Sequence, residues 1–142
     1  MDDLLKSKLL LYLQKLKIEF KCSMVLVSHD GTDLLSLSDH IIHLKGGRIS
    51  KKRNPIDLYF NPKNKEEALL FGHWNRIEIG NEIIQFRPNQ YQIFEFGEIE
   101  LNSVKSLFRG IYYENYCQTN QGELVLVSYN PLQKGIKIVI KK

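Results

Sequence analysis

Residues 24–30 read MVLVSHD, an apolar run that ends in a serine, a histidine and an aspartate. A short continuous apolar run is typical of a β-strand that is buried on both faces, as in a sheet covered by helices. We therefore expect a strand at Met24–Val27, with His29 just beyond its carboxyl end.

The segments on either side of this run mix helical and strand patterns. Upstream, apolar residues recur at three- and four-residue spacing and predict one apolar face of a helix: Leu5, Leu9, Tyr12, Leu13 and Leu16. Asp2 or Asp3 stands where an N-cap acceptor is expected. Downstream we expect a short helix at 34–37, strands at 41–44 and 48–50, a helix from Pro55 to Pro62, and a last helix at 64–71 closed by Gly72.

The pattern changes near Gly72. Seven strand-like runs follow, separated by turn signals, at 83–86, 91–96, 98–101, 105–113, 116–119, 123–128 and 136–140. Many short strands at close spacing indicate a small all-β barrel or sandwich. We therefore expect two domains, residues 1–72 and 73–142.

Composition argues against some classes of protein but does not identify a function. The chain has 142 residues, of which 43% are hydrophobic, and its net charge is +4. No apolar run reaches the roughly 18 residues that a bilayer crossing requires, and Met1-Asp2-Asp3 does not begin like a signal peptide. The charge is sparser than a nucleic-acid footprint, and we interpret residues 51–53 as a solvated turn, with contact to a phosphate or an acidic partner as the alternative.

Cysteine and histidine usage gives no sign of a metal site. The two cysteines, Cys22 and Cys117, are expected to be reduced thiols, with a disulfide as the alternative. His40, His43 and His73 show no ligand spacing with either cysteine. We expect no zinc site.

Five motifs occur in a fixed order: VSHD at 27–30, LSDHII at 37–42, LKGGRI at 44–49, NPIDLYFNP at 54–62 and FGHWN at 71–75. This order resembles the end of the nucleotide-binding subunit of ABC importers. The resemblance implies that residues 1–72 are an α/β remnant, the end of a RecA-like ATPase domain. It also implies that His29 is the switch histidine, which reaches the γ-phosphate, and that Asp2 is the D-loop aspartate, both acting only in an intact ATPase.

The second half resembles a TOBE domain, the OB-like accessory barrel of such importers. The matching motifs are FRP at 86–88, Gly110 before an aromatic strand, and GIKI at 135–138. Asn89 stands where the TOBE pattern usually has a glutamate, and His40 stands where the ATPase pattern usually has an arginine. These departures loosen the subfamily and not the superfamily.

Three motifs of a working ATPase are absent from the sequence: the phosphate-binding loop, the signature motif, and an apolar strand ending in Asp-Glu. We therefore expect the chain not to be an enzyme by itself and to resemble a portion that starts at the D-loop. ATP and Mg²⁺ belong to the intact parent, and none is expected for this fragment. The resemblance implies a second ATPase copy and a membrane permease as partners, at the cytoplasmic face of the membrane, for an importer of ferric ion, polyamine, sulfate, molybdate or sugar.

Aromatic residues leave a second function open. Eight of them are concentrated in the first part of the predicted barrel: Phe86, Tyr91, Phe94, Phe96, Phe108, Tyr112, Tyr113 and Tyr116. We expect them to fill a small core, with a ligand or permease surface, or base stacking, as alternatives. The alternative function is a free-standing OB-like module that binds a small anion or single-stranded nucleic acid, although such a module has no need for residues 24–76.

The predicted N-terminal half also has exposed apolar surface. A strand at 24–27 would keep an open edge, and the leucine-rich helix at 4–16 exceeds what a three-strand remnant can cover. We expect this half either to associate with a second copy, by exchange of the helix for example, or to be poorly ordered.

Overall fold

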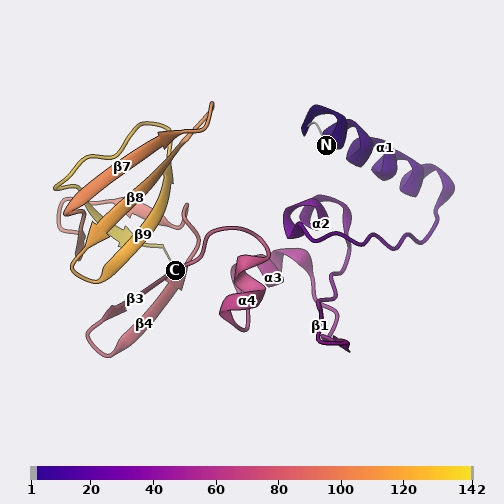
Figure 1. The fold of residues 1–142 in the computed structure, drawn as a ribbon, viewed down its shortest axis with the longest axis horizontal. Helices are drawn as coiled ribbons and strands as arrows, with labels where there is room; N and C mark the ends of the chain where they lie inside the picture. The colour runs from indigo at the N-terminus through magenta and orange to yellow at the C-terminus, as the bar shows by residue number, and fades with distance from the viewer. Residues whose placement is uncertain (1–2, 142) are drawn as a thin grey trace. The chain divides into compact units, whose positions relative to one another are not determined.

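The computed structural model describes residues 3–141 of the chain and divides it into two compact units, Met1–Gly72 and His73–Lys142 (Figure 1). The division lies at the change in sequence pattern near Gly72. Each unit is described by itself below. None of the helices in the described part of the chain combines the length and the apolar character that a bilayer crossing needs.

Unit 1 contains four helices and one two-stranded hairpin. Its elements are α1 (Asp3–Phe20), α2 (Gly31–Leu37), β1 (Leu44–Lys45), β2 (Arg48–Ile49), α3 (Pro55–Phe60) and α4 (Lys65–Leu69). The four helices lie at the predicted positions, although α1 extends further at its C-terminal end, α2 begins three residues earlier, and α4 is shorter than predicted. The residue after it, Lys21, has a positive φ of 47°, the left-handed conformation that commonly ends a helix.

Side-chain caps explain where the three shorter helices begin. Asp30, Asn54 and Asn64 each accept a hydrogen bond from a backbone N–H of the first turn. Such caps satisfy donors that have no partner inside the helix. Pro55 occupies the first turn of α3, where its missing N–H costs nothing.

The core of unit 1 is small and is bordered by a largely covered arginine. Ile41, Leu58 and Phe71 are its buried apolar residues. Arg53, whose side chain is only 13% exposed, pairs with Asp57 and Glu67. The interpretation of residues 51–53 as a solvated turn is therefore wrong for the arginine, which joins α3 to α4 from within.

The expected strand at Met24–Val27 is not formed. Residues 21–28 have neither helical nor strand structure (Figure 1), and Val25 and Val27 are 95% and 90% exposed. A strand buried on both faces requires a neighbour on each side, and no described residue supplies one. Likewise, the expected strand at 41–44 is reduced to a bridge between Ile41 and Arg53 and to the two residues of β1, so unit 1 has no helix-covered sheet among the described residues.

Unit 2 is all-β in its described residues, as expected. Its strands are β3 (Asn75–Ile79), β4 (Glu82–Phe86), β5 (Tyr91–Ile93), β6 (Ile99–Glu100), β7 (Ser103–Phe108), β8 (Tyr113–Thr119), β9 (Gly122–Ser128) and β10 (Lys137–Ile140). They form three antiparallel sheets, β3-β4, β7-β8-β9 and β5-β10-β6. These pairings do not close into a barrel, and β3 was not among the predicted strands.

Two buried asparagines join the pieces of unit 2. The Asn75 side chain donates to the Val125 carbonyl and accepts from the Val125 N–H, both at 2.8 Å, so it connects β3 to β9 as a strand neighbour would. Asn115 is fully buried in β8 and accepts from the backbone N–H of Leu132 at 3.0 Å. Around them lies one apolar core: Ile77, Phe86, Ile99, Leu101, Cys117, Leu124, Leu126, Leu132 and Ile138.

The expectation that the aromatic residues fill this core is mostly wrong. Only Phe86 among the eight is fully buried. Phe94 and Phe96 are 52% and 78% exposed, although their alternation with Ile93 and Glu95 is the pattern of a strand with one covered face. The cause is that β5 ends at Ile93, so residues 94–98 do not continue the pleat that alternation assumes.

Candidate functional site

His29 lies at a bend between the irregular segment 21–28 and the first residue of α2, with its side chain exposed. The bend is held by its neighbours. The Asp30 N–H donates to the Ser28 hydroxyl at 3.0 Å, and that hydroxyl donates to Asp33 at 3.3 Å. The backbone that carries the imidazole is therefore fixed by hydrogen bonds on both sides of it.

The two carboxylate oxygens of Asp30 have different partners at this bend. Its Oδ1 accepts from the backbone N–H and the hydroxyl of Thr32, at 3.0 and 2.6 Å, which caps α2. Its Oδ2 lies 3.1 Å from the Lys6 ammonium of α1. The Thr32 hydroxyl first, and then Lys6, lower the pKa of Asp30 to about 2. Hydrogen bonds to Asp33 first, and then to Asp30, raise the pKa of Lys6.

Gly31 fixes the opposite side of the bend. Its N–H donates to the Leu70 carbonyl at 3.1 Å. A Cβ at this position would lie 2.4 Å from the same oxygen and 2.8 Å from the Phe71 ring. Only glycine allows the start of α2 to approach the end of α4 this closely.

The bend and α4 border an open depression of ≈ 600 Å³, lined by His29, Asp30 and Thr32 on one side and by Glu66, Leu69, Leu70 and Gly72 on the other. In the described part of the chain, the His29 side chain has no hydrogen-bond partner. An exposed imidazole on a fixed backbone can donate to a phosphate oxygen or orient a water molecule.

The other residues considered in the sequence are not brought to this site. Asp2 lies outside the described residues. His40 and His43 do not line the depression, and His73 belongs to unit 2. Residues 3–141 contain no group of three or more histidine, cysteine, aspartate or glutamate side chains able to hold a metal ion, and both cysteines are free thiols.

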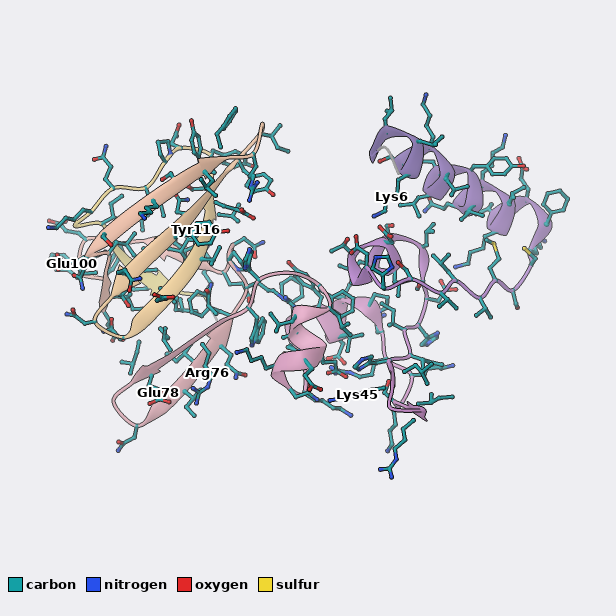
Figure 2. All side chains as sticks on the ribbon, viewed as in Figure 1. Lys6, Lys45, Arg76, Glu78, Glu100 and Tyr116 are labelled. Atoms are coloured by element: carbon teal, nitrogen blue, oxygen red, sulfur yellow. The ribbon has the colours of Figure 1, made fainter. Side chains whose placement is uncertain are left out.

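Unit 2 holds a polar cluster that the sequence did not indicate. Two nitrogens of Arg109, at 2.8 and 2.7 Å, reach one oxygen of Glu114. His73 lies 3.8 Å from the other oxygen and meets the Tyr116 ring edge-on. Arg109, Glu114 and Tyr116 belong to one hairpin, β7 to β8, whereas His73 comes from a distant segment that no local pattern could have joined to them. Tyr116 projects from the β7-β8-β9 sheet (Figure 2).

Arg87 of the FRP motif is also more buried than its charge predicts. Its side chain is fully buried and its guanidinium lies 4.7 Å from the centre of the Trp74 ring. It also donates to the His73 carbonyl at 3.2 Å. Arg87 therefore holds the first residues of unit 2 against the turn after β4.

Exposed apolar side chains gather at one end of the β7-β8-β9 sheet. Phe108 pairs in register with Tyr113, which pairs with Ser128, so the β7-β8 turn and the end of β9 lie together. Phe108, Ile111 and Tyr129 are 64%, 82% and 86% exposed there. We call these three residues the hairpin-end patch.

No model of a known protein family matches the chain. The descriptions of the His29 bend and of the hairpin-end patch therefore rest on the residues of this chain.

Proposed function

We propose that the chain is the C-terminal portion of the ATP-binding subunit of an ABC importer, with His29 as the switch histidine. The observation that carries the proposal is the order of the five motifs across residues 27–75. In this proposal unit 1 is the end of the nucleotide-binding domain and unit 2 is its TOBE domain. ATP hydrolysis by the parent drives the import of a solute.

The surroundings of His29 support this role. Phosphoryl transfer is catalysed by donors that are already positioned where charge develops. His29 is exposed at the rim of an open depression, while Asp30 and Gly31 hold its backbone from two directions. Such a histidine can meet a phosphate without reorganising the loop that carries it.

This chain alone does not fit ATP and Mg²⁺. His29 and Thr32 offer donors at the depression, but Asp30 is committed to Lys6 and Thr32. The sequence holds no glycine-rich loop that could surround a triphosphate. In the proposal, residues of the parent that precede this chain hold the nucleotide and the metal ion, and this chain supplies only the switch.

For unit 2 we propose an OB-like TOBE barrel that contacts partner proteins. Its all-β composition and the Asn75 connection between β3 and β9 support this fold. The hairpin-end patch is an exposed apolar surface, and such surfaces often mark protein contacts. The partners in this proposal are a second ATPase copy and the permease, which would hold the parent at the cytoplasmic face of the membrane.

One observation favours the alternative, a free-standing OB-like binding module. Phe94 and Phe96 are exposed and adjacent, with ring centroids 6.1 Å apart, and exposed aromatics can stack on bases. However, Glu95, Glu98 and Glu100 accompany them in the sequence. Negative charge at this position opposes both ligands of the alternative, a small anion and the phosphate backbone of single-stranded nucleic acid.

The proposal is tested in two steps. Isothermal titration of this chain with Mg-ATP is expected to give no heat of binding, and a micromolar affinity would contradict the assignment. If the coding sequence upstream of Asp2 contains a phosphate loop in frame, the longer protein is expected to hydrolyse ATP. His29→Ala should lower its kcat by about 10²-fold or more, the scale for losing one positioned donor.

His40→Ala is the matched control in the longer protein. His40 is also an exposed histidine of unit 1, and it does not line the depression. We expect its kcat to equal that of the wild type. Equal kcat values for the His29 and His40 variants would refute the assignment of the switch histidine.

A further inference from the structure

One face of α1 is less exposed than the rest of this helix. Lys6, Leu10, Leu13, Leu16 and Lys17 are partly buried and recur at three- and four-residue spacing, which places them on one stripe. Three leucines lie between the two lysines, which stand near the ends of the stripe. The lysines are eleven residues apart, about 16 Å along the helix axis.

Each lysine reaches one end of the α2 segment. Lys6 Nζ lies 2.7 Å from Asp33 Oδ1 and 3.1 Å from Asp30 Oδ2, at the start of α2, and Figure 2 shows Lys6 directed from α1 toward α2. Lys17 Nζ lies 2.6 Å from Asp39 Oδ2, just beyond the end of α2. We call these two lysines and three aspartates the lysine clamp.

The Lys6 end of the clamp acts on the bend that carries His29. Asp30 directly follows His29 and also caps α2 through Thr32. Asp33 accepts from Ser28, on the other side of His29. One ammonium group therefore holds carboxylates that are bonded to the chain both before and after the histidine.

We infer that Lys6 is a positioning residue for His29, which couples the docking of α1 to the geometry of the switch bend. The inference rests on the proposed function only for what His29 does to a phosphate. The coupling itself rests on the contacts of Lys6. Because Lys6 and Asp30 are partly exposed, with side chains 27% and 40% accessible, salt screens the contact.

The test uses the ¹⁵N-labelled chain and the exchange rate of the Gly31 amide, which is bonded to Leu70 at the edge of the bend. Lys6→Gln should raise this rate by about two- to fivefold, the range for partly exposed ion pairs, and should shift the His29 imidazole signals. Lys6→Arg should restore both, because it keeps the charge. Lys8→Gln is the control, an exposed lysine on the same helix.

High salt provides a second readout that a purely structural effect of the substitution would not reproduce. At 1 M NaCl the Gly31 exchange rate of the wild type should approach that of Lys6→Gln, while the variant should stay unchanged. The inference is overturned if Lys6→Gln behaves like Lys8→Gln, or if Lys6→Arg does not restore the wild-type rate. If His29→Ala leaves ATP turnover of the longer protein unchanged, the proposed function fails while the exchange result for Lys6 stands.

Discussion

Replacing Asn115 by alanine tests how far unit 2 depends on one buried amide. The Asn115 Oδ1 accepts from the Ser106 hydroxyl at 2.7 Å and from the Leu132 N–H at 3.0 Å. Its Nδ2 donates to the Leu126 carbonyl at 3.2 Å and to the Ser128 hydroxyl at 2.8 Å. The side chain therefore holds β7, β9 and the segment before β10 against β8.

The expected loss of stability depends on whether each hydrogen-bond partner of Asn115 can find another partner once the amide is removed. The hydroxyls can rotate toward other acceptors, as Ser128 already donates to the Asn130 carbonyl. The buried Leu132 N–H is left without a partner, at about 1–3 kcal/mol, and the lost bond to Leu126 adds about 1 kcal/mol. Asn115→Ala should therefore lower the free energy of unfolding by about 2–4 kcal/mol, a large part of the roughly 4–10 kcal/mol of a domain this size.

Urea unfolding followed by Trp74 fluorescence is the assay, because Trp74 is the single tryptophan and lies in unit 2. Asn102→Ala is the matched control. Asn102 is exposed, and among the described residues its side chain bonds Asn120 alone, at 2.8 Å, so Asn102→Ala should change the free energy of unfolding by no more than about 0.5 kcal/mol. An Asn115→Ala midpoint equal to that of Asn102→Ala, at unchanged m-value, would refute the reasoning.

Three further predictions follow from the structure. Gly97→Ala should destabilise unit 2 by about 1–3 kcal/mol in the same assay, because a Cβ there would lie 2.6 Å from the Ile138 carbonyl oxygen; an unchanged midpoint would mean that the backbone yields freely. Iodoacetamide at pH 8 should label Cys22 and spare Cys117, which is buried and whose pKa is raised to about 11 by desolvation; mass spectrometry of the folded chain decides this, and labelling of both thiols contradicts it. The pKa of Asp30 is lowered to about 2 from 3.8, so its contribution to stability is present above about pH 4 and lost as the pH falls toward 2; an NMR titration midpoint near 3.8 would contradict this.

Local signals predicted the helices well. The caps and breakers that bound α2, α3 and α4 act within one turn, so Pro55 and the asparagines before the helices suffice to place them. The hairpins of unit 2 were predictable for the same reason, because turn residues such as Gly80-Asn81 lie between the strands that they join. The strand β3 carried a usable signal too, since Ile77 and Ile79 alternate with charged residues, which is the pattern of a half-buried strand.

The strand expected at Met24–Val27 could not be decided locally. Its apolar run satisfies the composition of a buried strand, but a strand also needs neighbours whose N–H and C=O groups meet its own. The described residues provide none, and Val25 and Val27 remain exposed. The same limit applies to Phe94 and Phe96, whose alternation indicates a face only if the pleat continues beyond Ile93.

The position of His29 was predictable, whereas the side chains that hold it were not. Lys6 lies 24 residues before Asp30, and Asn75 lies 50 residues before Val125. A hydrophobic period encodes which face of an element is covered, but it contains no information about which distant polar group meets a given carboxylate or amide. In both units such polar contacts join segments that the apolar pattern leaves unconnected: Asn75 connects β3 to β9, and Lys6 connects α1 to the bend before α2. The geometry at His29 therefore depends on a long-range ion pair, and a change in α1 can alter the histidine without touching the motif that identifies it.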